Sequence, residues 1–231
     1  MMKTLISQLK SVLNPDEPLL IGVADLFQII QSDLKYGISI AMPIQKHIVK
    51  GILNGPTEAY FDEYHELERK LNALALSGEE FLLKKGFHAY AQTSERVKED
   101  SDWRTEVPHK TIATNAGIGW IGKSCLLITE KYGSAIRLSS ILTDAPLICD
   151  EPIRESRCGG CQKCVDSCPA HALSGVTWSV DVDRDSILNK EACVEKQIEL
   201  TRQNTSYTTE FLCGKCFAVC PFTQRYINSY K

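Results

Sequence analysis

Ten cysteines are distributed unevenly along this chain of 231 residues, and their spacing constrains the fold more than any other feature. None occurs before Cys125, and eight lie between Cys158 and Cys220. The first run has the spacing C-x2-C-x2-C-x3-C-P, which holds iron–sulfur cubes in bacterial ferredoxins and sends its fourth cysteine to a second cube. The second run has the spacing C-x2-C-x3-C-P, and one cysteine stands alone upstream of it.

The crossover between the two runs predicts two ligand sets of four cysteines, each for one [4Fe–4S] cluster. We call the first set site I; it consists of Cys158, Cys161, Cys164 and Cys220. The second set, site II, consists of Cys168, Cys193, Cys213 and Cys216. Closely spaced cysteine pairs also occur in zinc sites. The C-x3-C-P step in both runs favours two cubes over two zinc ions.

A glycine-rich stretch, GIGWIGK at residues 117–123, matches the G-x-G-x-x-G pattern of dinucleotide-binding turns. Such a turn follows a strand and opens a helix. Here the preceding residues favour a helix and the following ones a strand, so the nucleotide interpretation fails. Two alternatives remain. The glycines can allow a flat ligand to approach the backbone, or the segment is a tight turn whose Trp120 fills the core.

Composition indicates a folded chain with enough apolar residues, 43%, for a core. The net charge of −3 argues against a broad nucleic-acid-binding surface. No secretory signal or run of 18 apolar residues is present, so we expect a cytoplasmic protein without a membrane span. Cysteines in such a compartment are metal ligands or catalytic thiols more often than disulfides.

The order of apolar patterns predicts a mixed α/β first part and a cysteine-rich second part. Helices are expected at residues 2–13 and from Pro56 onward, and short strands at 19–24, 36–42, 88–91, 126–129 and 137–142. The polar stretch 148–157 marks a boundary. We therefore expect two domains, residues 1–150 and 151–231.

The glycine stretch and its flanks resemble the cobalamin-dependent epoxyqueuosine reductases. The resemblance rests on AGIGWIGK followed by LLIT, on Tyr132-Gly133-Ser134, on the segment 141–144 and on the double cysteine run at the expected place. Glu63-Tyr64-His65 is similar to an Asp-Tyr-His segment of that family. Reductive dehalogenases share the same module order as more distant relatives.

This resemblance implies an α+β fold, with a nitroreductase-like corrinoid-binding domain followed by a two-cluster bacterial-ferredoxin-like domain. It implies two [4Fe–4S] clusters and a cobalamin, whose cobalt the clusters would reduce to Co(I). It also implies an oxidoreductase. The expected corrinoid contacts are Tyr64, Gly117, Gly119, Trp120, Ile121, Gly122 and Lys123.

Two departures from the family pattern affect the predicted chemistry. Thr105 occupies the position of the family's proton-donating aspartate, three residues before Pro108. Glu106 or His109 could replace it, because a histidine can donate a proton near neutral pH, and His65 is a further catalytic candidate. The family also carries a C-terminal helical-repeat domain that helps to hold tRNA, whereas this sequence stops at Lys231. With the negative net charge, this argues against tRNA as a partner.

The leading hypothesis is therefore a cobalamin-dependent iron–sulfur reductase. The expected partners are a corrinoid, an electron donor such as ferredoxin or flavodoxin, and a small molecule or protein-bound corrinoid as substrate. The first alternative is a two-cluster electron carrier without catalysis. The second is an epoxyqueuosine reductase that uses a separate tRNA-binding partner.

Overall fold

The computed structural model describes residues 2–13 and 18–229, which form two compact units. The first unit combines residues 1–43, 67–118 and 137–153, and the second combines 44–66, 119–136 and 154–231. The two units therefore alternate along the chain, whereas the sequence predicts a single boundary. One passage between them, from Ile153 to Arg154, falls inside the predicted boundary stretch.

A four-stranded sheet forms the centre of the first unit, with the strand order β1-β2-β6-β3. Strands β1 and β2 pair antiparallel, with Leu20 opposite Ala41, and β3 pairs antiparallel with β6. Both β1 and β2 are rich in branched apolar residues, which suit a sheet that is covered on its faces. The strands are β1 (Leu20–Asp25), β2 (Tyr36–Pro43), β3 (Ala89–Ala91) and β6 (Ile136–Thr143).

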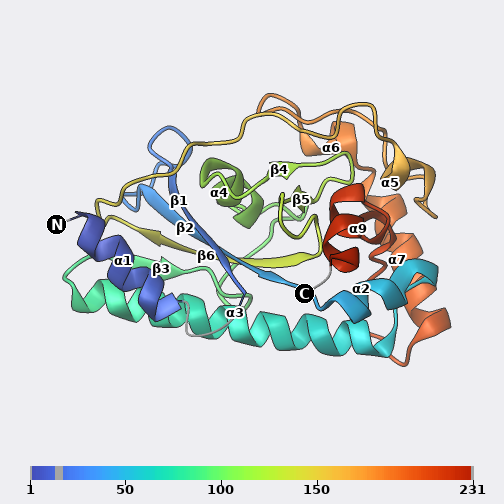
Figure 1. Ribbon diagram of the computed structural model, residues 1–231, viewed down its shortest axis with the longest axis horizontal. Helices are drawn as coiled ribbons and strands as arrows, with labels where there is room; N and C mark the ends of the chain where they lie inside the picture. The colour runs from blue at the N-terminus through green and yellow to red at the C-terminus, as the bar shows by residue number, and fades with distance from the viewer. Residues whose placement is uncertain (1, 14–17, 230–231) are drawn as a thin grey trace. The chain divides into compact units, whose positions relative to one another are not determined.

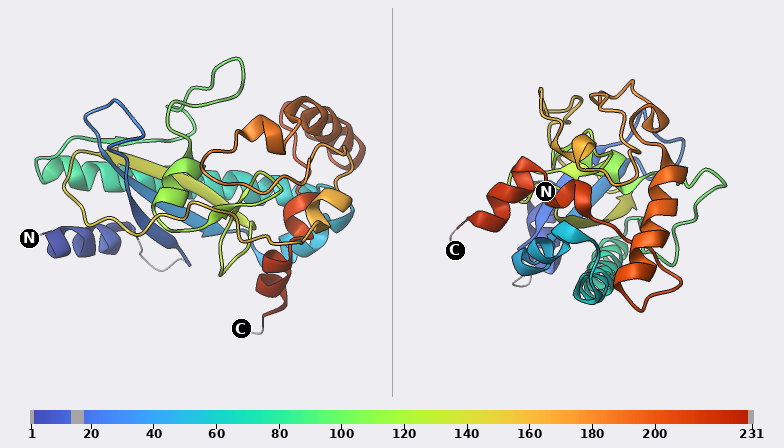
Figure 2. Two further views of the ribbon diagram at one scale, coloured as in Figure 1. Left: turned by 90° about the horizontal axis from the view of Figure 1, so that it is seen from above. Right: turned by 90° about the vertical axis from the view of Figure 1, so that its right-hand side faces the viewer.

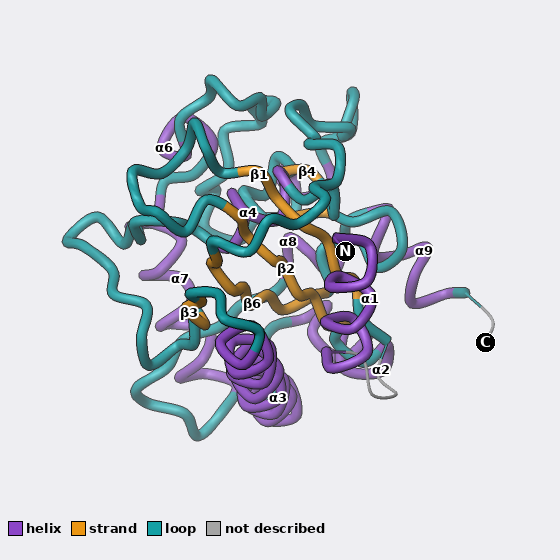
Figure 3. Tube along the Cα trace, turned by 90° about the vertical axis from the view of Figure 1, so that its left-hand side faces the viewer, coloured by secondary structure: helices purple, strands orange, loops and turns teal. Residues whose placement is uncertain are grey.

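Helices cover the sheet of the first unit (Figures 1 and 3). Helix α4 (His109–Asn115) packs on β1 and β2, and a side chain at Gly22 would meet the Ala116 carbonyl oxygen at 2.3 Å. Helix α1 (Met2–Leu13) and the long helix α3 (Glu58–Lys84) are the other helices that contribute to this unit. The absence of a side chain at Gly78 lets α3 lie close to Ile141 and Leu13. That glycine therefore permits close packing inside a continuous helix.

The second unit consists mainly of loops and short helices, and its C-terminal segment is coloured yellow-orange to red in Figures 1 and 2. It also contains the first turns of α3 and a two-stranded hairpin in which Trp120 pairs with Ile128. Its elements are α2 (Lys46–Gly51), η1 (Ile52–Asn54), β4 (Trp120–Ile121), β5 (Leu127–Ile128), α5 (Lys163–Asp166), α6 (Arg184–Ile187), α7 (Lys190–Asn204), α8 (Lys215–Ala218) and α9 (Pro221–Asn228).

The structure confirms the predicted α+β class and the predicted helix before the glycine stretch. Cys125 directly precedes the predicted strand 126–129. It is a buried turn residue with a φ of 59°, located between β4 and β5. Backbone in this region is unusual for a residue with a side chain, and an apolar pattern cannot reveal it.

Candidate functional site: two groups of cysteines

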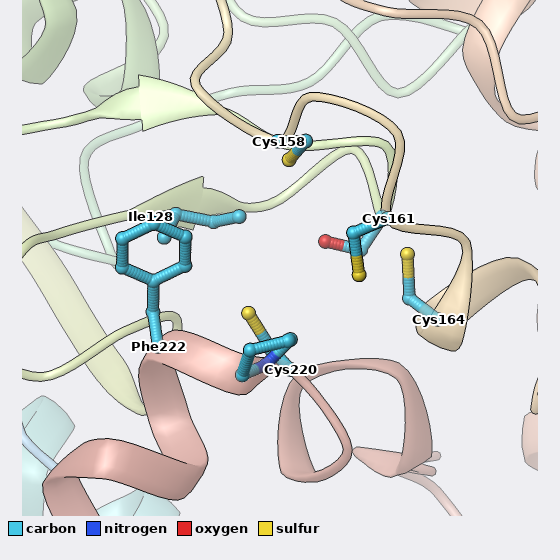
Figure 4. Close-up of a pocket in the computed structure, with 8 residues that line it drawn as sticks. Ile128, Cys158, Cys161, Cys164, Cys220 and Phe222 are labelled. Atoms are coloured by element: carbon cyan, nitrogen blue, oxygen red, sulfur yellow. The ribbon is translucent and has the colours of Figure 1, made fainter.

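The four cysteines of site I border one cavity in the second unit (Figure 4). Their sulfur atoms point into the same space. Ile128 and Phe222 form part of its wall, together with Ser124 and Pro221. Three ligands come from the loop that precedes α5 or from its first turn, and Cys220 comes from the residue that caps α9. Four thiols around a cavity with apolar walls match the donor set of a [4Fe–4S] cube.

Burial is the main influence on the protonation of two site I thiols, Cys164 and Cys220. Burial raises the pKa of Cys164 to about 11, and the neighbouring thiols Cys158, Cys220 and Cys161 add to this effect. Burial also raises the pKa of Cys220, although the backbone N–H groups of Thr223 and Phe222 oppose the shift. Thiols with raised pKa values hold their protons until a metal displaces them, so metal binding here releases protons.

The four cysteines of site II form a second group that adjoins the first. Cys168 is buried in an apolar cluster against which Cys193, Cys216 and Cys164 of site I are packed. Burial, followed by Cys213 and Cys193, raises the pKa of Cys216. The four cysteines that the crossover predicts for site II are thus brought together in space. Cys164, which belongs to site I, also lies beside this second group.

Two hydrogen-bond donors are directed at the sulfur atoms of site II. Gln197 Nε2 donates to Cys193 Sγ at 3.3 Å, one helical turn along α7. The backbone N–H of Ala172 donates to Cys168 Sγ at 3.4 Å. The sequence analysis missed Gln197, although its position four residues after a predicted ligand on a predicted helix was an available signal.

The loop that leads into Cys213 is attached to the first turns of α3. The ring of Tyr207 stacks on Phe61, with centroids 4.2 Å apart, and its hydroxyl donates to Asp62 Oδ1 at 3.1 Å. His65 Nε2 lies 2.9 Å from Glu210 Oε2. The predicted catalytic residue His65 therefore contacts the loop of site II, and Tyr64 beside it is partly exposed.

Most of the predicted corrinoid contacts in the glycine stretch belong to the second unit. Residues 119–123 are buried, and Trp120 is fully buried with its ring 4.9 Å from that of Phe222. A side chain at Gly119 would come within 2.1 Å of the Ile128 carbonyl oxygen. Hairpin packing therefore explains this glycine without a ligand. Gly117 belongs to the first unit, where it is partly exposed and has a φ of 64°.

The two candidate proton donors both belong to the first unit but have different surroundings. Glu106 is exposed. His109 begins α4, and its Nδ1 lies 2.5 Å from Ser140 Oγ. Burial, and secondarily the Arg137 guanidinium, lowers the pKa of His109 to about 4. The imidazole is therefore neutral at pH 7, which disfavours its action as an imidazolium acid.

The described part of the chain contains neither a single-ion site nor a membrane-spanning helix. Within residues 2–13 and 18–229, no group of three or more His, Cys, Asp or Glu residues is arranged to hold one metal ion. In a cube, four thiolates bind four different iron atoms and surround the cluster. In the same ranges, none of the helices has the length and apolar character that a bilayer crossing requires.

These cysteine groups define an iron–sulfur protein with two cluster sites. A family profile described as a 4Fe-4S double cluster binding domain matches residues 157–223. The chain is also 31% identical over 176 residues to the epoxyqueuosine reductase of Lactococcus garvieae, which covers 73% of this chain and 44% of the relative. The corresponding enzyme of Pseudomonas aeruginosa is 32% identical over 181 residues, covering 75% and 46%. The resemblance to the epoxyqueuosine reductases is thus confirmed.

Solved structures show the same fold. An epoxyqueuosine reductase aligns with a TM-score of 0.63 at 23% identity, covering 97% of this chain and 67% of that one. A catabolic reductive dehalogenase aligns with a TM-score of 0.67 at 18% identity, covering 88% and 30%. The chain spans less than half the length of the two curated relatives named above.

The expectation that tRNA is not a partner is wrong. An epoxyqueuosine reductase solved with an epoxyqueuosine-modified tRNA-Tyr stem loop has this fold, with a TM-score of 0.58 at 22% identity over 96% of this chain and 65% of that one. The net charge did not predict nucleic-acid binding correctly, because it is a property of the whole chain. Recognition of a nucleic acid depends on local contacts to phosphates, sugars and bases.

Proposed function

We propose that this protein is a cobalamin-linked iron–sulfur reductase that acts on epoxyqueuosine in a tRNA stem loop. The observation that carries the proposal is the assembly of eight cysteines into two adjoining groups of four. Site I and site II would each hold one [4Fe–4S] cluster. The similarity to epoxyqueuosine reductases and the fold shared with a reductive dehalogenase described as B12-dependent support the remaining parts.

The electron count of the reaction agrees with two clusters. Removal of an epoxide oxygen as water, leaving a carbon–carbon double bond, consumes two electrons and two protons. Each [4Fe–4S] cluster passes one electron at a time, and Cys164 lies beside both cysteine groups. The two sites could therefore form a relay in which an external reductant supplies both electrons.

Cobalamin would supply a redox-active cobalt between the clusters and the substrate. Of the predicted corrinoid contacts, Tyr64 in the second unit and Gly117 in the first are partly exposed and therefore accessible. Residues 119–123 would act indirectly, by shaping the cluster-bearing unit. For the protons, Glu106 and His109 both remain candidates; Glu106 is exposed, and His109 is neutral at pH 7.

The test is an anaerobic turnover assay with a modified stem loop. The protein is reconstituted with iron and sulfide, loaded with cobalamin and given a low-potential reductant and an epoxyqueuosine-containing tRNA-Tyr stem loop. Nucleoside mass spectrometry should show conversion of epoxyqueuosine to queuosine. A Cys161→Ala/Cys220→Ala variant, which lacks site I ligands, is the control and should give no product.

Two results would contradict the proposal. Eight irons per chain without cobalamin binding would leave a two-cluster electron carrier, the alternative that Thr105 at the expected aspartate position favours. Cobalamin binding with no conversion of the stem loop would exclude this substrate. Where the stem loop is converted, a comparison of Glu106→Gln with His109→Gln separates the two proton-donor candidates.

A further inference from the structure

Lys123, the last residue of the glycine stretch, is buried in the second unit. Its relative exposure is 4%, although lysine is among the residues least often buried. It follows Gly122, where an added side-chain carbon would lie 3.5 Å from Cys158 Sγ. It precedes Ser124, which lines the site I cavity. The backbone around Lys123 is therefore part of the wall of site I.

The ammonium group of Lys123 reaches the loop that carries the site I cysteines. Lys123 Nζ donates to the Gly159 carbonyl oxygen at 3.0 Å. Gly159 lies between Cys158 and Cys161 and has a φ of 54°, so this bond holds a tight turn of the ligand loop. An ammonium group has three N–H donors, and the Gly159 carbonyl oxygen accepts only one of them.

No acidic partner balances this buried charge in the part of the chain that the structure describes. None of the ion pairs found among residues 2–13 and 18–229 involves Lys123. A buried charge is costly unless an opposite charge compensates it. The four thiolates of site I, with the cluster that they would hold, carry net negative charge and lie beside it.

We propose that Lys123 is the counter-cation of the cluster at site I and raises the reduction potential of that cluster. The inference rests on the iron–sulfur part of the proposed function and is independent of cobalamin and of the substrate. It gives the GIGWIGK stretch a role in the cluster site: the glycines let the hairpin pack closely, and the lysine supplies positive charge.

The direction of the effect follows from electrostatics. One-electron reduction makes the cluster with its four thiolates more negative by one charge. A nearby cation in a poorly solvated position stabilises the reduced form more than the oxidised form. Removal of the cation therefore lowers the reduction potential of site I and leaves site II unchanged.

The experiment is a redox titration of the reconstituted full chain, followed by electron paramagnetic resonance. Lys123→Gln removes the charge but keeps an N–H donor for Gly159, whereas Lys123→Arg keeps the charge. Lys163→Gln is the matched control, because Lys163 lies in the same ligand region but is exposed, so solvent screens its charge. Gln197→Leu, which removes a donor to Cys193, identifies the signal of site II.

The site I midpoint is the one that Gln197→Leu does not move. Lys123→Gln should shift this midpoint to lower potential by at least about 59 mV, which is a tenfold change in the redox equilibrium for one electron. Lys123→Arg and Lys163→Gln should shift it much less. Loss of the site I iron in Lys123→Gln but not in Lys123→Arg would also support the charge role. Unchanged potentials in Lys123→Gln would overturn it, as would equal shifts or equal iron loss in the Gln and Arg variants. Failure to reduce epoxyqueuosine would leave these outcomes readable, because none of them depends on turnover.

Discussion

Site I and site II each offer four cysteine sulfur atoms, but the surroundings of these atoms differ. Site I has an apolar wall and a buried ammonium group, that of Lys123, at its ligand loop. Both sites have neutral N–H donors at sulfur: the backbone of Thr223 and Phe222 at Cys220 in site I, and Gln197 and the backbone of Ala172 in site II. Charge and hydrogen bonding both tune cluster potentials. Two sites with identical ligands in one chain can therefore be set to different potentials, which gives a relay its direction.

The largest expected effect tests the division into two sites. A Cys161→Ala/Cys220→Ala variant should lose one cluster and keep about four irons, because both cysteines belong to site I. A Cys161→Ala/Cys168→Ala variant should lose both clusters, although it also lacks two cysteines. Iron and sulfide analysis after anaerobic reconstitution measures this. The reverse result would show that each sequence run holds its own cluster and that the crossover is absent.

The second-largest expected effect tests whether the loop that leads into Cys213 stabilises site II alone. Tyr207→Ala removes the stack on Phe61 and the hydrogen bond to Asp62, and should lower the free energy of unfolding. Because this loop leads into Cys213, site II should lose iron to a chelator faster, while site I keeps its rate.

Tyr207→Phe is the matched control for that experiment. It keeps the ring stack and removes only the hydroxyl group, so it should lower the free energy of unfolding less than Tyr207→Ala does. Chelator-release kinetics, with the two clusters distinguished by their spectra, provide the readout. Equal acceleration of iron release at both sites would show that the loop supports the whole unit and not site II alone.

A smaller effect concerns the sulfur donors of site II. Gln197→Leu removes the bond to Cys193 Sγ, worth about 1 kcal/mol, so the site II redox equilibrium should shift about fivefold toward the oxidised form. Gln197→Glu is unsuitable as a control because it adds charge. Gln203→Leu, an exposed change on the same helix, should leave both midpoints unchanged. A shift of both midpoints in Gln197→Leu would mean that the sites are not separable.

The smallest expected effect concerns the protonation of His109 in the first unit. Burial raises the pKa of Cys164 and lowers the pKa of His109 to about 4; in each case it favours the neutral form. His109 should therefore show no protonation between pH 8 and 6 in nitrogen-15 NMR spectra. A midpoint near pH 6.5 would contradict this.

The same shift determines how acid affects stability. The unfolded chain takes up a proton on His109 near pH 6.5, whereas the folded chain resists this until about pH 4. Stability should therefore fall as the pH decreases from about 6.5 to 4. The fall should be smaller in a His109→Gln variant, as measured by urea unfolding of the apo-protein.

Helices and strands with a local apolar pattern could be predicted from the sequence. The roles of residues whose partners are distant in the sequence could not. The apolar run at 36–42 and the helix before the glycine stretch were correctly predicted, because periodicity and burial agree there. Gly78 could not be interpreted, because its neighbour Ile141 is distant in the sequence. The partners of Lys123 and His65, at Gly159 and Glu210, were equally inaccessible to pattern reasoning. The crossover pairing stays a prediction, which the double cysteine variants above test.

The alternation of the two units along the chain limits how this molecule can be taken apart. Six segments alternate between the units, so no single cut separates them. A fragment that begins at Arg154 would keep all eight site cysteines but lose Lys123, the β4–β5 hairpin and the α3 residues that hold Tyr207. The cysteine-rich part is therefore not a detachable cassette. Its recombination into another protein would have to carry three separate stretches of sequence together.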